Sequence, residues 1–148
     1  MTPGASQHLI SVATTLGGRV IAALPEDHYA VGDTKMSALI CVLMAQHVDG
    51  AADLLIRENA AIRSIFSRAA PLVDGDLGTR LGEAGTATDA NFRISTLEAG
   101  NAALANLLIE LQTALEARSE DWAKELDRES WRVLRDGADG RMLQLPPA

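Results

Sequence analysis

The chain is poor in cysteine, in aromatic residues and in positive charge. Its 148 residues include one cysteine, Cys41, so no disulfide can form within the chain. Aromatic residues make up only 3% of the sequence, which leaves Leu, Ile, Val, Ala and Met to build the core. The net charge of -7 argues against nucleic acid as a partner and, more weakly, against anionic membranes, because both bind basic surfaces.

Recognisable catalytic and metal-binding motifs are also missing. The histidines, His8, His28 and His47, do not occur in Glu-x-x-His or His-x-x-x-His spacing, which excludes a ferritin-like di-metal centre. There is no Gly-x-Ser-x-Gly elbow, Walker loop or dinucleotide fingerprint. Cys41 lies inside an apolar run, which is typical of an unreactive buried thiol. We therefore expect no catalytic residue, no metal and no cofactor.

Export and membrane signals are weak as well. The N-terminus has no basic stretch of the kind that opens a secretory signal. The longest apolar run, Ala38 to Ala45, is too short to cross a bilayer. We expect a cytoplasmic protein without a membrane partner.

The strongest pattern that is present is an eleven-residue repeat of apolar residues between Met36 and Ala69. It comprises the sets Ile40, Ala51 and Ile62; Leu43, Leu54 and Ile65; and Met44, Leu55 and Phe66. Eleven residues complete three turns of an α-helix, so each set stacks along one face. The repeat passes Gly50 without a change of phase, which predicts one long helix over about 32–69.

A second pattern is a seven-residue apolar repeat, which predicts a helix over about 90–117 that packs lengthwise on a neighbour. Thr88 or Asp89 is a candidate cap for this helix. The members of the repeat are Ile94, Leu97, Asn101, Leu104, Leu108, Leu111 and Leu115.

Shorter patterns complete the expected fold. Helices are predicted over about 6–24 and 119–137, with a connector at 71–89 and a tail at 138–148 that is apolar enough to fold back. Leu77 and Leu81 predict a short extra helical turn within the 74–88 segment. The expected fold is an all-α antiparallel (up-down) bundle of four main helices in one domain, 1–148.

Four polar residues are candidates for inward or register-setting positions. His47 and Glu58 fall in the register of the apolar repeat, but they are about 16 Å apart along the helix and cannot ligate one metal together. Asn59 and Asn101 each begin a similar Asn-Ala-Ala-Ile/Leu stretch on the two long helices. We hypothesise that both lie on or beside the inner face and fix the register; the alternative is coincidence in an Ala-rich chain.

The sequence offers more apolar surface than a four-helix monomer of this length obviously buries. The candidate interface residues are Ile94, Leu97, Leu104, Leu107, Leu108, Leu111, Leu115, Trp122 and Trp131. We expect a non-enzymatic, self-associating protein–protein interaction module, as a homodimer or with another protein partner. The alternatives are a binder of a small apolar ligand in the bundle core and, after it, an enzyme of unrecognised type.

Overall fold

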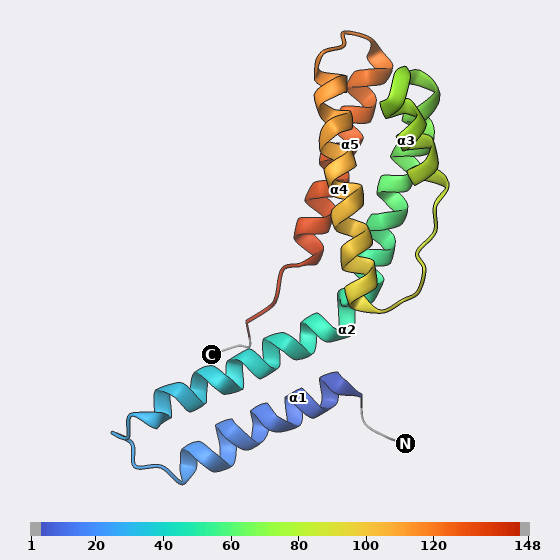
Figure 1. Ribbon diagram of the computed structural model, residues 1–148. Coiled ribbons are helices and arrows are strands. Elements are labelled where there is room, and N and C mark those ends of the chain that lie inside the picture. Colours follow the sequence, from blue (N-terminus) through green and yellow to red (C-terminus); the bar gives the residue numbers. More distant parts are fainter. Residues whose placement is uncertain (1–3, 146–148) are drawn as a thin grey trace. The chain divides into compact units, whose positions relative to one another are not determined.

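The computed structural model describes residues 4–145, and over this range the chain forms helices and no strand (Figure 1). This confirms the all-α prediction. The helices are α1 (Ala5–Thr14), α2 (Ala30–Ala69), α3 (Gly75–Thr86), α4 (Ile94–Glu116) and α5 (Asp121–Gly140), with a π-helical turn η1 (Thr15–Val20) and a 3-10 turn η2 (Ala70–Leu72).

The chain divides into two compact units, and the division falls inside α2. Unit 1 comprises Met1–Ala51 and Met142–Ala148, and unit 2 comprises Ala52–Arg141. Each unit has its own arrangement of helices. A single domain and a four-helix antiparallel bundle that includes the first helix therefore stay predictions.

The long helix predicted from the eleven-residue repeat is present as α2, which has 40 residues and continues through Gly50. It begins at Ala30, slightly before the predicted start. It ends at Ala69 because Pro71, within η2, lacks the backbone N–H that would continue the α-helical hydrogen bonds.

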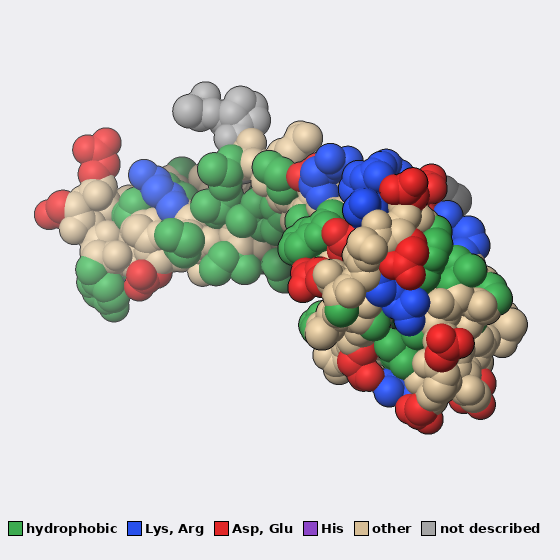
Figure 2. Space-filling view, turned by 90° about the horizontal axis from the view of Figure 1, so that it is seen from above, with side chains coloured by type: hydrophobic (Ala, Val, Ile, Leu, Met, Phe, Trp, Pro, Cys, Tyr) green, Lys and Arg blue, Asp and Glu red, His purple; other side chains and the backbone are tan. Residues whose placement is uncertain are grey.

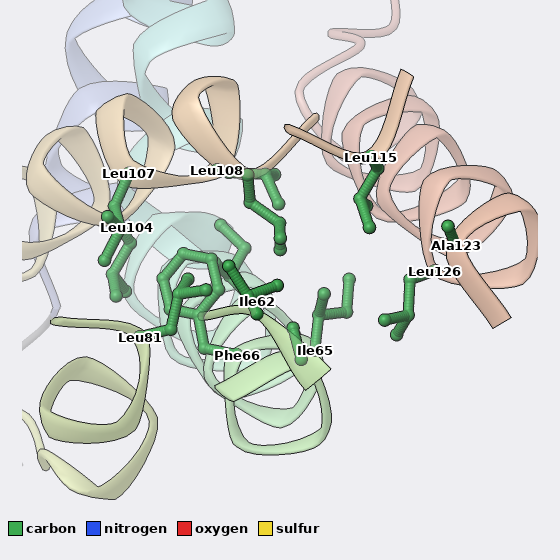
Figure 3. Packing of buried hydrophobic residues seen from close by; sticks show 13 residues of the cluster. Ile62, Ile65, Phe66, Leu81, Leu104, Leu107, Leu108, Leu115, Ala123 and Leu126 are labelled. Carbon is green, nitrogen blue, oxygen red and sulfur yellow. The ribbon is translucent and has the colours of Figure 1, made fainter. Parts of the chain in front are cut away.

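The core of unit 2 lies between the C-terminal part of α2 and the helices α3, α4 and α5 (Figure 3). Ile62, Ile65 and Phe66 of α2 are almost completely buried there. They pack with Leu81 of α3, with leucines of the seven-residue repeat in α4, and with Leu126 of α5. Both sequence repeats thus contribute their apolar sides to one core.

The short turn expected in the connector is a full helix, α3, of 12 residues. Its first residue, Gly75, has φ +77°, a left-handed conformation that glycine adopts without strain. Gly78 brings the helix against the preceding chain, since a Cβ there would lie 1.9 Å from the carbonyl oxygen of Val73. The glycines of this segment therefore permit close packing, rather than only flexibility.

In unit 1, α1 and η1 run beside the N-terminal part of α2 (Figure 1). Ala13 of α1 and Ala38 and Val42 of α2 line one shallow groove between them. The tail returns to this unit, where the Gln46 carboxamide donates to the Gln144 carbonyl (2.8 Å) and accepts from the Gln144 N–H (2.9 Å). Pro146 and Pro147 of the predicted tail lie outside the described residues.

Candidate functional site

The unit 1 part of α2 carries a row of exposed apolar side chains. Met36, Ile40, Met44 and Val48 follow one another at four-residue spacing, which places them along one side of the helix. Their exposed fractions are 57%, 50%, 40% and 37%. We call these four residues the α2 stripe.

Unit 1 buries little apolar surface of its own. Among its described residues, only Ala13, Ala45 and Ala51 are buried, and all three have the smallest apolar side chain. The space-filling view shows hydrophobic side chains gathered on the surface of this unit, at the left (Figure 2). The described part of unit 1 therefore covers the α2 stripe only in part.

His47 belongs to the same side of α2 as the stripe, because it follows Met36 by eleven residues and Met44 by three. The sequence places it on the inner face, but the structure exposes it. The described part of unit 1 leaves His47 and this side of α2 exposed.

Glu58 is the second predicted inward polar residue, and its side chain is only 9% exposed. It lines a groove of about 240 Å³ between α2 and α5, with Leu54, Ala61 and Val133 among the other walls. One carboxylate oxygen, Oε2, lies 2.7 Å from a guanidinium nitrogen of Arg141.

A glycine of α5 allows this ion pair to form. Gly137 lies against Glu58, and a Cβ added to Gly137 would be 3.0 Å from Glu58 Oε2. The Gly137 carbonyl also accepts a hydrogen bond of 2.7 Å from Arg141. The Glu58 charge is thus paired inside unit 2, which makes the groove a structural contact between α2 and the end of α5.

Asn59 and Asn101 are brought together by the structure. Asn101 Nδ2 donates to Asn59 Oδ1 at 3.0 Å, which joins α2 to α4. Asn59 is completely buried, and its Nδ2 donates to the Leu97 carbonyl (3.4 Å) and to Asp89 Oδ1 (3.3 Å). A buried carboxamide with its donors and its acceptor all engaged is specific for one alignment of its partners.

The same cluster contains an ion pair that the sequence analysis missed. Arg63 of α2 donates to Asp89 Oδ1 at 2.7 Å, and both side chains are less than 15% exposed. The hydrogen bond from Arg63 holds the pKa of the Asp89 carboxyl below its usual value; burial opposes this effect, and the Arg63 charge and the Asn59 hydrogen bond add to it. We call Asn59, Arg63, Asp89 and Asn101 the polar cluster.

The predicted role of Asp89 as a helix cap is wrong, because α4 begins at Ile94 with Arg93 in the cap position. Asp89 lies in the preceding segment and faces α2 instead. The only signal in the sequence was the charge of the two residues: Asp89 is acidic and ends the predicted connector, and Arg63 is basic and lies on the preceding long helix.

Most of the predicted interface residues belong to the internal core of unit 2 and are not exposed to a partner. Ile94 and Trp122 are half-buried, and Trp131 is exposed at 58%. The buried ones are Leu97, Leu104, Leu107, Leu108, Leu111 and Leu115. The seven-residue repeat identified a packing surface correctly, but α2, α3 and α5 cover that surface within the chain.

The described residues contain no group of three or more His, Cys, Asp or Glu side chains placed to hold a metal ion. By length and composition, one helix within them, Ala30–Leu72, could cross a membrane. Its apolar 18-residue stretch is 17% buried. Core helices of soluble proteins, which are mostly buried, and signal sequences pass the same test of length and composition.

Comparison of the chain with protein-family models, with curated proteins and with solved structures finds no match.

Proposed function

We propose that this protein is a non-enzymatic interaction module that self-associates through the α2 stripe of unit 1. The single observation that carries the proposal is the exposure of four large apolar side chains in one row. Contiguous exposed apolar surface of this kind marks sites of protein or membrane contact. Unit 2, in contrast, covers its own leucine-rich surfaces.

The comparison between the two parts of α2 supports this proposal. Ile40 and Met44 lie two eleven-residue repeats before Ile62 and Phe66, so they occupy equivalent positions on the helix. Ile62 and Phe66 are fully buried, whereas Ile40 and Met44 are 50% and 40% exposed. The sequence maintains one apolar face along the whole helix, and the described chain covers only the unit 2 part of it.

The charges that flank the stripe favour a protein partner over a lipid bilayer. Lys35 precedes it and Asp49 follows it, which leaves an uncharged length of about 20 Å at 1.5 Å per residue. The hydrocarbon layer of a bilayer is about 30 Å thick. A helix face of this length suits another helix better than a membrane crossing.

The alternative of a small-ligand binder has less support. The groove beside Glu58, at about 240 Å³, is smaller than the roughly 300 to 1,000 Å³ of typical ligand pockets. Its buried carboxylate is already paired with Arg141.

Sedimentation velocity over a wide concentration range tests the proposal. We expect a dimer or higher oligomer at micromolar concentration and a monomeric Met44→Asp variant. Ile109→Asp is the matched control, because Ile109 is 61% exposed on α4, outside the stripe, and this variant should associate like the parent. A parent chain that stays monomeric at all concentrations would overturn the proposal. Co-sedimentation of a monomer with phosphatidylcholine–phosphatidylglycerol vesicles would replace it with a membrane role.

A further inference from the structure

We propose that the occupant of the α2 stripe is the same stripe of a second copy of this chain, paired antiparallel about a two-fold axis at Ile40. This inference rests on the proposed function, and it specifies which residues meet. An isologous dimer requires a surface that is complementary to itself. The surface formed by Asp33, Met36, Ile40, Met44 and His47 meets this requirement.

The part of the stripe from Met36 to Met44 is symmetric about Ile40, and the fourth stripe residue, Val48, lies opposite Gly32. In an antiparallel pair centred on Ile40, the numbers of two facing residues add up to 80, which is twice 40. Met36 of one copy therefore faces Met44 of the other, and Ile40 faces itself. Met36 and Met44 have unbranched, flexible side chains that fill irregular gaps well between two packed helices.

The polar ends of the surface are complementary under the same rule. Asp33 and His47 are both exposed, and they lie on the stripe side of α2, three residues before Met36 and three after Met44. The antiparallel pairing places Asp33 of one copy opposite His47 of the other, twice per dimer. A parallel pairing would instead place Asp33 opposite Asp33 and His47 opposite His47.

Neither residue has a charged side chain one turn away on its own helix. The residues three and four positions from Asp33 are Tyr29, Ala30, Met36 and Ser37, and those around His47 are Leu43, Met44, Gly50 and Ala51. Among the described residues, neither takes part in an ion pair. The acid and the histidine are therefore both available to a second copy, which selects the antiparallel direction.

Disulfide trapping tests the direction directly, since the only native thiol can be removed by Cys41→Ser. In that background, Met36→Cys and Met44→Cys chains are mixed, mildly oxidised and separated by mass. The antiparallel pairing predicts mixed 36–44 dimers. It predicts little 36–36 product, because those positions are about 12 Å apart along the axis, beyond the roughly 7 Å between Cα atoms that a disulfide spans. Predominant 36–36 and 44–44 products would overturn it.

Ile40→Cys in the same background separates failure of this inference from failure of the proposed function. It should cross-link with itself whenever two stripes meet at Ile40. A chain that is dimeric by sedimentation but gives no 40–40 product associates through another surface, which overturns this inference and leaves self-association intact. A chain that is monomeric by sedimentation overturns both.

A charge exchange tests the polar ends. Asp33→Lys and His47→Asp should each weaken dimerisation about tenfold or more, and the double variant should return to within about threefold of the parent. Additive losses in the double variant would contradict the pairing of Asp33 with His47.

Discussion

At the residue scale, Asn59 is the completely buried polar group whose hydrogen bonds join α2 to α4. Both of its N–H donors and its carbonyl oxygen have partners, in Asp89, the Leu97 carbonyl and Asn101. Removal of the side chain takes one hydrogen bond from each of these partners. Asp89 keeps the hydrogen bond from Arg63, whereas the part-buried Asn101 loses its hydrogen bond to Asn59. A buried polar group left unsatisfied costs about 1 to 3 kcal/mol.

We therefore expect Asn59→Ala to lower the free energy of unfolding by roughly 2 to 3 kcal/mol in urea titrations followed by circular dichroism. Asn106→Ala is the matched control, because Asn106 is an exposed residue of α4. It should be neutral or slightly stabilising, since alanine has the higher helix propensity. A loss in Asn59→Ala no larger than the change in the control would contradict the role of the buried carboxamide.

The pair Asn59 and Asn101 can be tested separately by a double-mutant cycle. Because their side chains share a direct hydrogen bond, the two alanine substitutions should be non-additive by about 0.5 kcal/mol or more. The cycle is measured by the same urea titrations. Additive losses would show that the two residues act independently and that their similar sequence contexts are a coincidence.

Asp89 gives the polar cluster a defined dependence on pH. Its pKa in the folded chain lies below its usual value, chiefly because Arg63 donates a hydrogen bond to the carboxylate. A depressed folded-state pKa contributes stability above the unfolded pKa, and this contribution is lost as the pH falls through the folded value. The stabilising contribution of Asp89 should thus be complete near neutral pH and absent in strong acid.

We expect Asp89→Asn to be less stable than the parent at pH 7, with the difference shrinking steadily below about pH 4. Urea unfolding of both chains between pH 7 and pH 2.5 measures it. Asp136→Asn, on the exposed side of α5, is the control and should track the parent at all pH values. A difference between Asp89→Asn and the parent that does not change with pH would exclude the ion pair as its cause.

The sequence supports a hypothesis about Asn59 and Asn101, but not about Arg63 and Asp89. The two asparagines share a local motif at equivalent places on apolar repeats, which is visible without a structure. Arg63 and Asp89 are 26 residues apart, with the turn η2 and the helix α3 between them. Only the path of that intervening chain decides that the two meet, and no local pattern encodes that path.

At the element scale, α3 shows why a glycine-rich segment can form a helix. Its glycines lower helix propensity, but they allow the helix to approach its neighbours at distances that a Cβ would prevent. Gly78 is such a position, facing the Val73 carbonyl, whereas a Cβ at Gly82 would lie an ordinary 3.7 Å from Ala70 Cβ. The two glycines are one turn apart in the same helix and differ mainly in this contact.

This difference predicts opposite effects of the same substitution. Gly78→Ala should lower the free energy of unfolding by roughly 1 to 3 kcal/mol, because the added methyl group overlaps backbone atoms that cannot move freely. Gly82→Ala should raise it by about 0.5 to 1 kcal/mol through helix propensity. Thermal and urea unfolding of both variants provide the measurement. Equal effects of the two substitutions would contradict the close contact at Gly78.

The long helices were predictable because their evidence is local: a period of eleven for α2 and of seven for α4. A period identifies the apolar side of a helix but not the element that covers it. Leu104, Leu108 and Leu111 therefore looked like an interface and are core, whereas Met36 and Ile40, which share the registers of the buried Ala69 and Ile62, are exposed. The covering neighbour is a property of tertiary packing, which a single helix pattern does not contain.

At the scale of the whole molecule, the two units differ in what can hold them folded. Unit 2 has a contiguous core of Ile, Leu and Phe side chains contributed by four helices. The described part of unit 1 buries only three alanines, and most helical stability in proteins comes from the packing of an apolar face. If a second copy covers the α2 stripe, the order of unit 1 should depend on protein concentration, as any structure stabilised by association does.

Hydrogen–deuterium exchange at two concentrations, one above and one below the dissociation constant, measures this dependence. We expect the backbone amides of α1 and of residues 36–48 to exchange faster at the lower concentration. The amides of α4 between Leu104 and Leu115 should exchange at the same rate at both concentrations, because unit 2 supplies their cover. In Met44→Asp the unit 1 amides should exchange fast at every concentration, which ties their protection to the stripe. Slow exchange of residues 36–48 at both concentrations would mean that α1 and the unit 1 part of α2 are stable without a second copy. The exposed stripe would then contribute nothing to the folding of unit 1.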